Sequence, residues 1–182
     1  MNTAVISNFI YRRATMDDYD VFFNIMLDAY TNTEPIAKAL KVTKDEASSF
    51  INSFLPHYLP QGYSLIMEYD GEVIGAALLQ CVDRPNPIYS SGPDPDLPPK
   101  TFLIETIAHK LTGNFWDMLP SHFTRCVHAL YLAVIPSWHF RGAASALTAA
   151  ALRMSRDVGA DVAFAELLSN HFSAVSMMVP IE

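Results

Sequence analysis

The feature that most constrains this chain is an apolar run that leads, through a short loop, into an Ala-rich segment. Residues 132–147 read LAVIPSWHFRGAASAL, in which the apolar run ends at Pro136 and Gly142 directly precedes a helix-forming sequence. A strand, a loop and a helix N-terminus in this order form a cradle for phosphate, because the first turn of a helix has unpaired backbone N–H groups and a partial positive charge. Glycine lets the backbone approach an anion closely. The segment therefore predicts a site for a phosphate-bearing cofactor.

Composition and charge limit the kind of protein in which this segment lies. The chain has 182 residues, 51% of them hydrophobic, which is enough for one domain with a buried core. A net charge of −7 argues against a general nucleic-acid binder. Cys81 and Cys126 are too widely spaced for a metal motif and are expected as reduced thiols. No run reaches the roughly 18 apolar residues of a membrane span, and no signal peptide is evident. We therefore expect a cytoplasmic protein with no membrane partner.

The spacing of apolar residues predicts alternating strands and helices. Strands are expected at residues 9–14, 63–69, 72–82, 126–135 and 162–168, and helices at residues 19–30, 44–59, 100–112, 142–158 and 170–178. Residues 83–99 are rich in Pro, Gly, Ser and Asp and are expected to form a long surface loop. This alternation predicts an α/β or α+β domain around a mixed sheet.

The loop before the last long helix resembles a known cofactor signature. It has neither the Lys-Ser/Thr of a P-loop nor the three glycines of a dinucleotide fingerprint. It resembles the acetyl-CoA signature of the GNAT acetyltransferases, which is Arg or Gln, two residues, Gly, one residue, then Gly or Ala. Here the signature runs from His139 to Ala144 and follows Val134-Ile135-Pro136. His139 replaces the usual Arg or Gln, and Arg141 is the nearby charge for a phosphate. The alternative is an ordinary strand–loop–helix connection.

Two distant segments resemble one branch of that family. Residues 169–174 read SNHFSA, similar to the Ser-Ser-His-Tyr-Ser-Ala stretch of the insect and nematode arylalkylamine N-acetyltransferases. Residues 33–36 read TEPI, similar to their Asp-Glu-Pro-Leu stretch, whose Glu is the proposed general base. The resemblance implies catalytic roles for Glu34, Ser169 and Ser173. A helix beginning near Ser169 places both serines on one face. The alternatives are a solvated loop carboxylate for Glu34 and a helix cap and an exposed residue for the serines.

The resemblance implies a fold, a reaction and a cofactor site. The fold is the α+β (three-layer α/β) GNAT acyl-CoA N-acyltransferase fold, with a mixed central sheet and helices on both faces. The reaction is transfer of acetyl from acetyl-CoA to a primary amine, such as dopamine, tyramine, octopamine or serotonin, by direct attack in a ternary complex. The cofactor-binding positions implied are Leu132, Ala133, Val134, His139, Phe140, Arg141, Gly142, Ala143, Ala144 and Ser145.

Other aromatic and histidine residues near these motifs have ordinary structural interpretations. Trp138 and Phe140 are expected to pack the loop. His128 matches the first of two strand histidines in the vertebrate arylalkylamine enzymes, with Leu130 at the second position. A core or surface histidine is the preferred interpretation of His128. His171 is either a site residue or a polar residue at a helix start.

The C-terminal segment favours an incomplete domain. A GNAT domain continues past a helix such as the one expected at residues 170–178 into a Gly-Phe turn and two more strands. We therefore expect a single domain over residues 1–182 that lacks its last strands. The strand at 162–168 then has an open edge, which favours a homodimer. Two other functions fit the first motif: a weak or inactive CoA-binding interaction protein of GNAT fold, and an acetyltransferase for polyamine or lysine acceptors.

Overall fold

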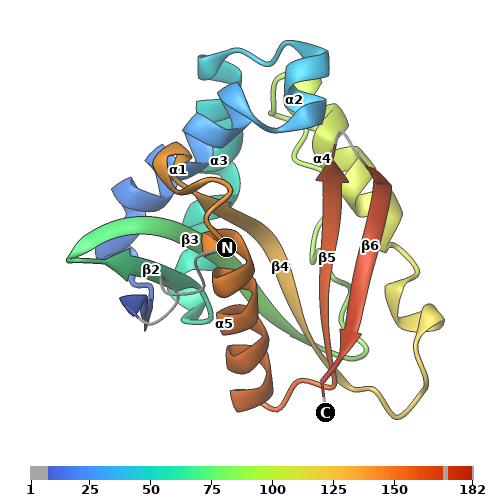
Figure 1. The fold of residues 1–182 in the computed structure, drawn as a ribbon. Helices are drawn as coiled ribbons and strands as arrows, with labels where there is room; N and C mark the ends of the chain where they lie inside the picture. The colour runs from blue at the N-terminus through green and yellow to red at the C-terminus, as the bar shows by residue number, and fades with distance from the viewer. Residues whose placement is uncertain (1–7, 170–171, 182) are drawn as a thin grey trace.

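The protein is built on one mixed sheet of six strands in the order β1-β2-β3-β4-β5-β6 (Figure 1). The computed structural model describes residues 8–169 and 172–181, with residues 167–169 and 172–179 described by their backbone alone. The strands are β1 (Ile10–Arg13), β2 (Leu65–Tyr69), β3 (Glu72–Asp83), β4 (Arg125–Val134), β5 (Val162–Ser169) and β6 (Phe172–Pro180). Neighbouring strands are antiparallel except β4 and β5, which are parallel.

Helices cover both faces of this sheet. They are α1 (Tyr19–Asn32), α2 (Pro35–Leu40), α3 (Lys44–Tyr58), α4 (Pro99–Thr112) and α5 (Ala143–Asp157). Successive residues of a strand point to opposite faces. On β3, Ala76 and Leu78 accordingly pack with α1 and α3, whereas Ala77 and Leu79 pack with α5. The result is the three-layer α+β fold that the sequence predicts.

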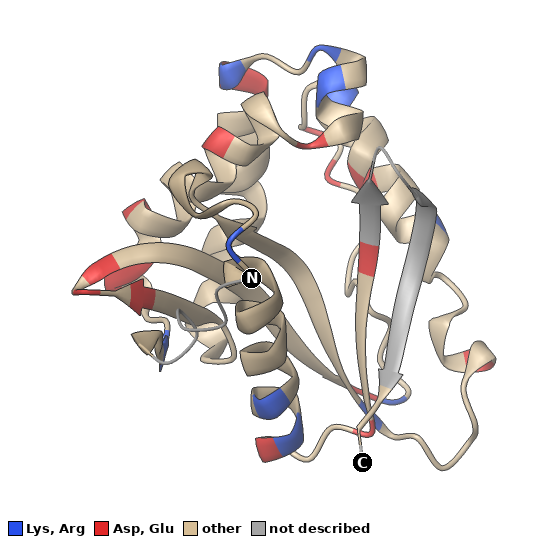
Figure 2. Cartoon of the chain, viewed as in Figure 1, with Lys and Arg blue, Asp and Glu red and all other residues tan. Residues whose placement is uncertain are grey.

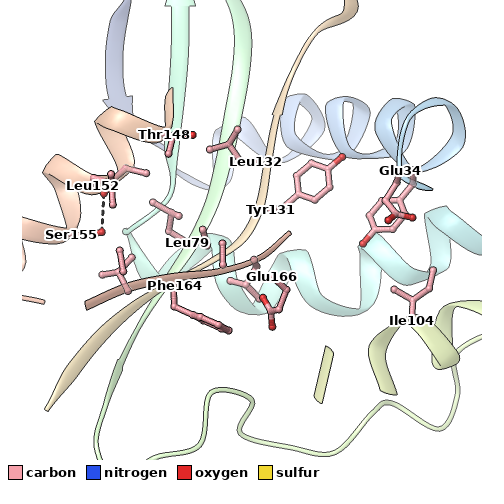
Figure 3. A pocket seen from close by; sticks show the side chains of 17 residues that line it. Glu34, Leu79, Ile104, Tyr131, Leu132, Thr148, Leu152, Ser155, Phe164 and Glu166 are labelled. Carbon is pink, nitrogen blue, oxygen red and sulfur yellow. Dashed lines mark hydrogen bonds between the residues drawn. The ribbon is translucent and has the colours of Figure 1, made fainter. Parts of the chain in front are cut away.

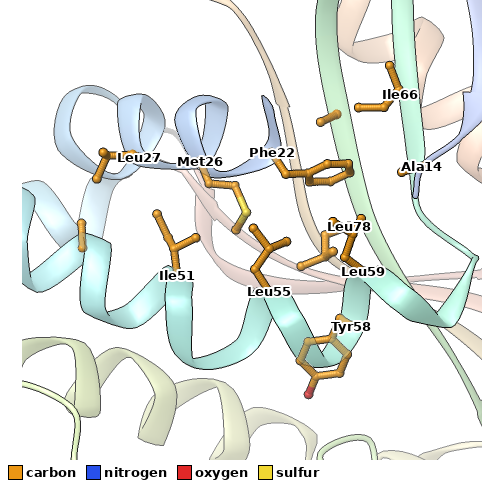
Figure 4. Close-up of a cluster of buried hydrophobic side chains, with 12 residues drawn as sticks. Ala14, Phe22, Met26, Leu27, Ile51, Leu55, Tyr58, Leu59, Ile66 and Leu78 are labelled. Carbon is orange, nitrogen blue, oxygen red and sulfur yellow. The ribbon is translucent and has the colours of Figure 1, made fainter. Parts of the chain in front are cut away.

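A core of buried apolar side chains lies between α1, α3 and the sheet (Figure 4). Phe22 and Met26 of α1 and Ile51 and Leu55 of α3 are fully buried there. Burial of each such side chain contributes about 2 kcal/mol. Thr43 and Glu46 form a capping box that starts α3 in register with this core.

The pairing of β4 with its two neighbouring strands is irregular at two places. The register with β3 shifts so that Leu78 pairs with Tyr131 and Leu79 with Ala129, which leaves Leu130 as a bulge residue on β4. The parallel register with β5 extends only from Cys126 to His128. Beyond that point β4 and β5 diverge (Figure 1). The outer half of β4 therefore has an edge that faces away from β3 and is not paired with β5.

The segment after β5 corrects one prediction. Residues 172–180 form β6, antiparallel to β5, where a helix was expected at 170–178. The helix was expected because the serine motif was interpreted as a helix start. Pairing along most of β5 outweighs this local signal, since strand formation depends strongly on tertiary context. The edge of residues 162–168, expected to be open, is covered by β6. The strand edge on which the homodimer prediction rested is therefore paired within the chain.

The other expected strands and helices are confirmed, with ends within about two residues of the predicted ones. Helix α2 was not among the expected helices. In fact Pro35 occupies the first position of α2, where proline is well tolerated, and Glu34 caps it. None of the helices in the described part of the chain has the length and apolarity of a membrane span.

Candidate active site

A cavity of about 320 Å³ opens where β4 and β5 separate (Figure 3). We call it the cleft. Its walls come from β4, β5 and the inward face of α5, and its far end from the junction of α1 and α2. The polar or ionisable side chains that line it are Tyr30, Glu34, Tyr131, Thr148, Ser155 and Glu166. The other lining residues are apolar, so the cleft is a largely dry site with a few polar groups.

Glu34 is the predicted catalytic residue that the structure brings to the cleft, and Leu132, a predicted cofactor-binding residue, also lines it (Figure 3). As the N-cap of α2, its Oε2 accepts a hydrogen bond from the backbone N–H of Ala37. Its Oε1 is buried and has no hydrogen-bond partner among the described residues. Buried polar atoms are nearly always paired, so this carboxylate oxygen beside the cleft is free to accept a hydrogen bond from a bound ligand.

Two tyrosines near Glu34 remain neutral phenols. Burial, followed by the charges of Glu34 and Glu105, raises the pKa of Tyr30. Burial also raises the pKa of Tyr131, with smaller contributions from Tyr30 and Glu34. The two rings stack at a centroid distance of 5.8 Å. Around neutral pH these groups therefore supply aromatic surface and O–H groups and no charge.

A second cavity of about 130 Å³ adjoins the cleft. We call it the aromatic recess. It is lined by five rings, those of Tyr30, Phe50, Phe54, Tyr58 and Tyr89. Two carboxylates, Glu105 and Glu166, also line it. Burial raises the pKa of Glu105. The recess offers an aromatic enclosure with acidic groups at its wall.

Glu166 and His128 were not assigned to the site from the sequence. His128 is fully buried, and its Nε2 lies 2.6 Å from Oε2 of Glu166. Its Nδ1 lies 3.0 Å from Nε2 of Gln80. The interpretation of His128 as a core histidine is correct, but its partner lines both cavities. The available signal was a lone charged residue, Glu166, within the apolar strand sequence VAFAELLS.

The cofactor loop has the backbone expected for a phosphate site. Gly142 is the N-cap of α5 with φ 80°, and no side chain caps this helix. The first hydrogen bond runs from the Ala146 N–H to the Gly142 carbonyl, at 3.0 Å. The N–H groups of Ala143, Ala144 and Ser145 therefore have no acceptor within the helix. A Cβ at Gly142 would meet nothing within 4 Å, so a bulky anion has access to this helix end.

The side chains of the same loop differ from expectation in one case. Phe140, at φ 58°, is fully exposed, so the prediction that it packs the loop is wrong. Its left-handed backbone conformation is unusual for a bulky residue and belongs to the turn that leads to Gly142. Trp138 does pack, at 4.6 Å from the Tyr69 ring and 5.6 Å from the Phe9 ring.

Arg141 and His139 of this loop each contact a neighbouring residue. The Arg141 guanidinium lies 5.6 Å from the centroid of the Trp138 ring. His139 turns back toward β4, and its Nε2 lies 3.0 Å from the carbonyl oxygen of Val134. His139 thus secures the end of β4, and Arg141 is the loop's cation next to the open helix end.

The predicted serines lie on two strands and do not share one helix face. Ser169 ends β5 and pairs with Phe172 of β6. Ser173 is the next residue of β6. The prediction that both hydroxyls line one face of a helix is therefore wrong. Their side chains, and His171, lie outside the described residues. Among the described residues no cluster of three or more His, Cys, Asp or Glu side chains could hold a metal ion.

The sequence and the fold place the chain in a known family. Residues 20–178 match the model of the acetyltransferase (GNAT) family, so the chain belongs to that family. It is a GNAT-family N-acetyltransferase, as the cofactor loop predicts. No curated protein matches the sequence.

Several solved structures share the fold. The C-terminal condensation domain of Ebony, solved with beta-alanyl-dopamine, has TM-score 0.73 and 16% identity over 89% of this chain and 76% of that chain. A putative arylalkylamine N-acetyltransferase 7 from the mosquito Aedes aegypti has TM-score 0.70 and 20% identity over 87% and 67%. The Drosophila melanogaster polyamine N-acetyltransferase has TM-score 0.59 and 16% identity over 89% and 77%. Identities this low establish a shared fold and leave the acceptor open.

Proposed function

We propose that this protein transfers the acetyl group of acetyl-CoA to the primary amine of an arylalkylamine, with Glu34 as proton acceptor. The observation that carries the proposal is the buried, unpaired Oε1 of Glu34 at the end of the cleft. An alkylammonium has a pKa near 10 and must lose a proton before it attacks a thioester. A carboxylate within hydrogen-bond reach of the amine performs this step, and Oε1 of Glu34 is the atom that receives the proton.

The chain's residues fit acetyl-CoA at two places. The N–H groups of Ala143, Ala144 and Ser145, with Gly142 and Arg141, would bind the pyrophosphate. The unpaired edge of β4 beyond His128 would bind the amide groups of the pantetheine arm, as an added strand binds a sheet edge. When bound there, the thioester supplies the activated acetyl group. Backbone N–H groups near Leu132 would donate to its carbonyl oxygen.

The aromatic recess favours an acceptor with an aromatic ring. Its five rings adjoin the cleft, and aromatic pairs contribute about 0.5–1.5 kcal/mol beyond the area they bury. An arylalkylamine would place its ring in the recess and its amine in the adjoining cleft. Ser169 and Ser173 remain predicted residues of this site, with the role of donating a proton to the leaving thiolate.

A second acceptor class is favoured by one observation. Glu105 and Glu166 both line the recess, and no Lys or Arg is among the described residues that line it. A diamine would place a second cation beside these carboxylates. Polyamines are therefore the alternative acceptors, and an interaction protein that binds CoA without turnover is the alternative outside catalysis.

The test is thiol release from acetyl-CoA with an acceptor panel. The panel contains tyramine, dopamine, octopamine, serotonin and the diamine putrescine. The proposal predicts amine-dependent release with lower KM for the aromatic amines. A lower KM for putrescine would establish the alternative acceptor class. CoA binding without release for any amine would overturn the catalytic proposal.

A further inference from the structure

Glu166 stands where the cleft and the aromatic recess meet. It is the single charged residue of β5 (Figure 2) and lines both cavities, together with Tyr30, Ile104 and Leu130. Its side chain is only 11% exposed. An acceptor that spans the two cavities must pass this carboxylate.

The hydrogen-bond network fixes how Glu166 is presented. Nε2 of Gln80 lies 2.9 Å from the carbonyl oxygen of Ile88, which can only accept. The amide NH2 of Gln80 therefore donates to Ile88 and, with its other hydrogen, to Nδ1 of His128. Because Nδ1 accepts, neutral His128 carries its hydrogen on Nε2 and donates it to Oε2 of Glu166. His128 thus orients the carboxylate of Glu166.

The second oxygen of Glu166 is weakly engaged. The Tyr89 hydroxyl lies 3.4 Å from Oε1, a long hydrogen bond. Burial and the charge of Glu166 raise the pKa of Tyr89, so Tyr89 is a neutral phenol. The Tyr89 ring stacks on His109 at 4.4 Å. Burial lowers the pKa of His109, against a smaller opposite effect of the Glu166 charge.

Among the described residues, every Asp, Glu, Lys or Arg that lines the two cavities is a glutamate. The carboxylates among their lining residues are Glu34, Glu105 and Glu166, and no Lys or Arg lines either cavity in the described part of the chain. Glu166 and Glu105 accept hydrogen bonds, but none of the three carboxyl groups has a Lys or Arg partner among the described residues. A bound cation would supply such a partner in this poorly solvated site. The neighbouring rings of Tyr30 and Tyr89 add cation–π attraction for the same kind of ligand.

We propose that Glu166, oriented by His128, recognises the positive charge of the acceptor and is the specificity-determining residue that selects ammonium compounds over neutral ones. The inference rests on the proposed function, because it concerns the acceptor of the same reaction. Glu34 and Glu166 then have separate roles. Glu34 accepts the proton in turnover, whereas Glu166 contributes to binding of the charged amine.

The test compares two ligands that share an aromatic framework, of which only one carries a positive charge. Tyramine and tyrosol share the hydroxyphenylethyl group, and tyrosol carries a hydroxyl in place of the ammonium group. Their Kd values are measured by titration calorimetry on the CoA-bound full chain, so that no turnover is needed. The variants are Glu166→Gln, Glu105→Gln and Glu34→Gln, with Glu72→Gln as control. Glu72 is an exposed residue at the start of β3, so this control changes net charge by the same amount outside the site.

Glu166→Gln is suited to this test because its amide oxygen still accepts the hydrogen of His128. We expect the native protein and the Glu72→Gln control to bind tyramine about 10- to 100-fold more tightly than tyrosol. In Glu166→Gln this preference should fall to about threefold or less, with an unchanged Kd for CoA. The inference is overturned if Glu166→Gln keeps the native preference, or if Glu105→Gln or Glu34→Gln abolishes it instead.

His128 is a positioning residue in this account. His128→Gln retains an amide N–H donor for Glu166, whereas His128→Leu does not. We expect His128→Gln to restore most of the tyramine preference that His128→Leu loses. Loss of the preference to the same extent in both variants would contradict this role.

A thiol-release assay distinguishes this inference from the proposed function. Selective binding of tyramine without acetyl transfer would refute the proposed function alone. Acetyl transfer, with an unchanged preference for tyramine in Glu166→Gln, would refute this inference alone.

Discussion

Oε2 of Glu34 accepts the backbone N–H of Ala37, and this bond leaves Oε1 of the same carboxylate buried and unpaired beside the cleft. Glu34 is thus both the cap of α2 and a carboxyl group at the end of the cleft. The cap holds the carboxylate in place, so the proton acceptor needs little rearrangement when an amine arrives.

Replacement of Glu34 by Gln separates these two roles. The amide oxygen of Gln still caps α2, but the side chain no longer accepts a proton from an ammonium group. We expect kcat to fall about 100- to 1000-fold, with an unchanged Kd for CoA. Steady-state kinetics and CoA titration measure the two effects. Glu34→Ala also removes the cap and should lower the free energy of unfolding by about a further 1 kcal/mol. A kcat for Glu34→Gln within threefold of native would exclude Glu34 as proton acceptor.

Substitution at Gly142 tests the phosphate cradle. The position has φ 80° and open space around it, so Asn and Asp both fit, and both tolerate this conformation better than other side chains. Gly142→Asn should weaken CoA binding modestly, whereas Gly142→Asp puts a carboxylate at the open helix end and should abolish it. Equal affinity of the two variants for CoA would show that the pyrophosphate lies elsewhere.

Arg141 is expected to supply charge to the same cradle. Arg141→Gln should weaken CoA binding about tenfold, through loss of a charge-assisted hydrogen bond to phosphate. Arg153 is a matched control, because its guanidinium also lies over a ring, 5.8 Å from the centroid of Tyr11, but farther along α5. Arg153→Gln should leave the Kd for CoA unchanged. A similar loss in both variants would indicate a general effect of charge.

Asp18 makes the stability of the fold depend on pH. Arg12 donates to both oxygens of Asp18 at 2.8 and 2.7 Å, and these hydrogen bonds lower the pKa of Asp18. A pKa that is lower in the folded than in the unfolded state adds stability above the ordinary value near 4, and this stability is lost as the pH falls through the lowered pKa. Asp18→Asn should therefore cost about 1–3 kcal/mol at pH 7. In urea unfolding the deficit should shrink at pH 3. A deficit that is the same at both pH values would contradict this origin.

The features that were predictable from the sequence are those with a local physical signal. Asp70 and Gly71 both have positive φ, as a tight hairpin between β2 and β3 requires. Gly142 marks the start of α5 because only a residue that tolerates φ 80° fits there. The loop signature, and Glu34 before Pro35, are likewise contiguous in the chain, so the order and spacing of their residues were informative by themselves.

The features that were not predictable depend on contacts between distant segments. β6 forms because β5 offers it a partner along most of its length, whereas its own sequence was interpreted as a helix. The pairing of His128 with Glu166 joins two strands whose parallel register ends beside it. The cleft arises from a bulge at Leu130 and from the divergence of β4 and β5. Neither feature is predictable from the local sequence.

The most direct measurement of the central claim is the product formed from tyramine and acetyl-CoA. Mass spectrometry would quantify N-acetyltyramine beside the thiol released, for the native chain, Glu34→Gln and Gly142→Asp. Direct acetyl transfer predicts one N-acetyltyramine per thiol with the native chain. It predicts about 1% or less of that rate with Glu34→Gln, which still binds CoA, and no CoA binding by Gly142→Asp. Thiol release without N-acetyltyramine, or full turnover by Glu34→Gln, would contradict it.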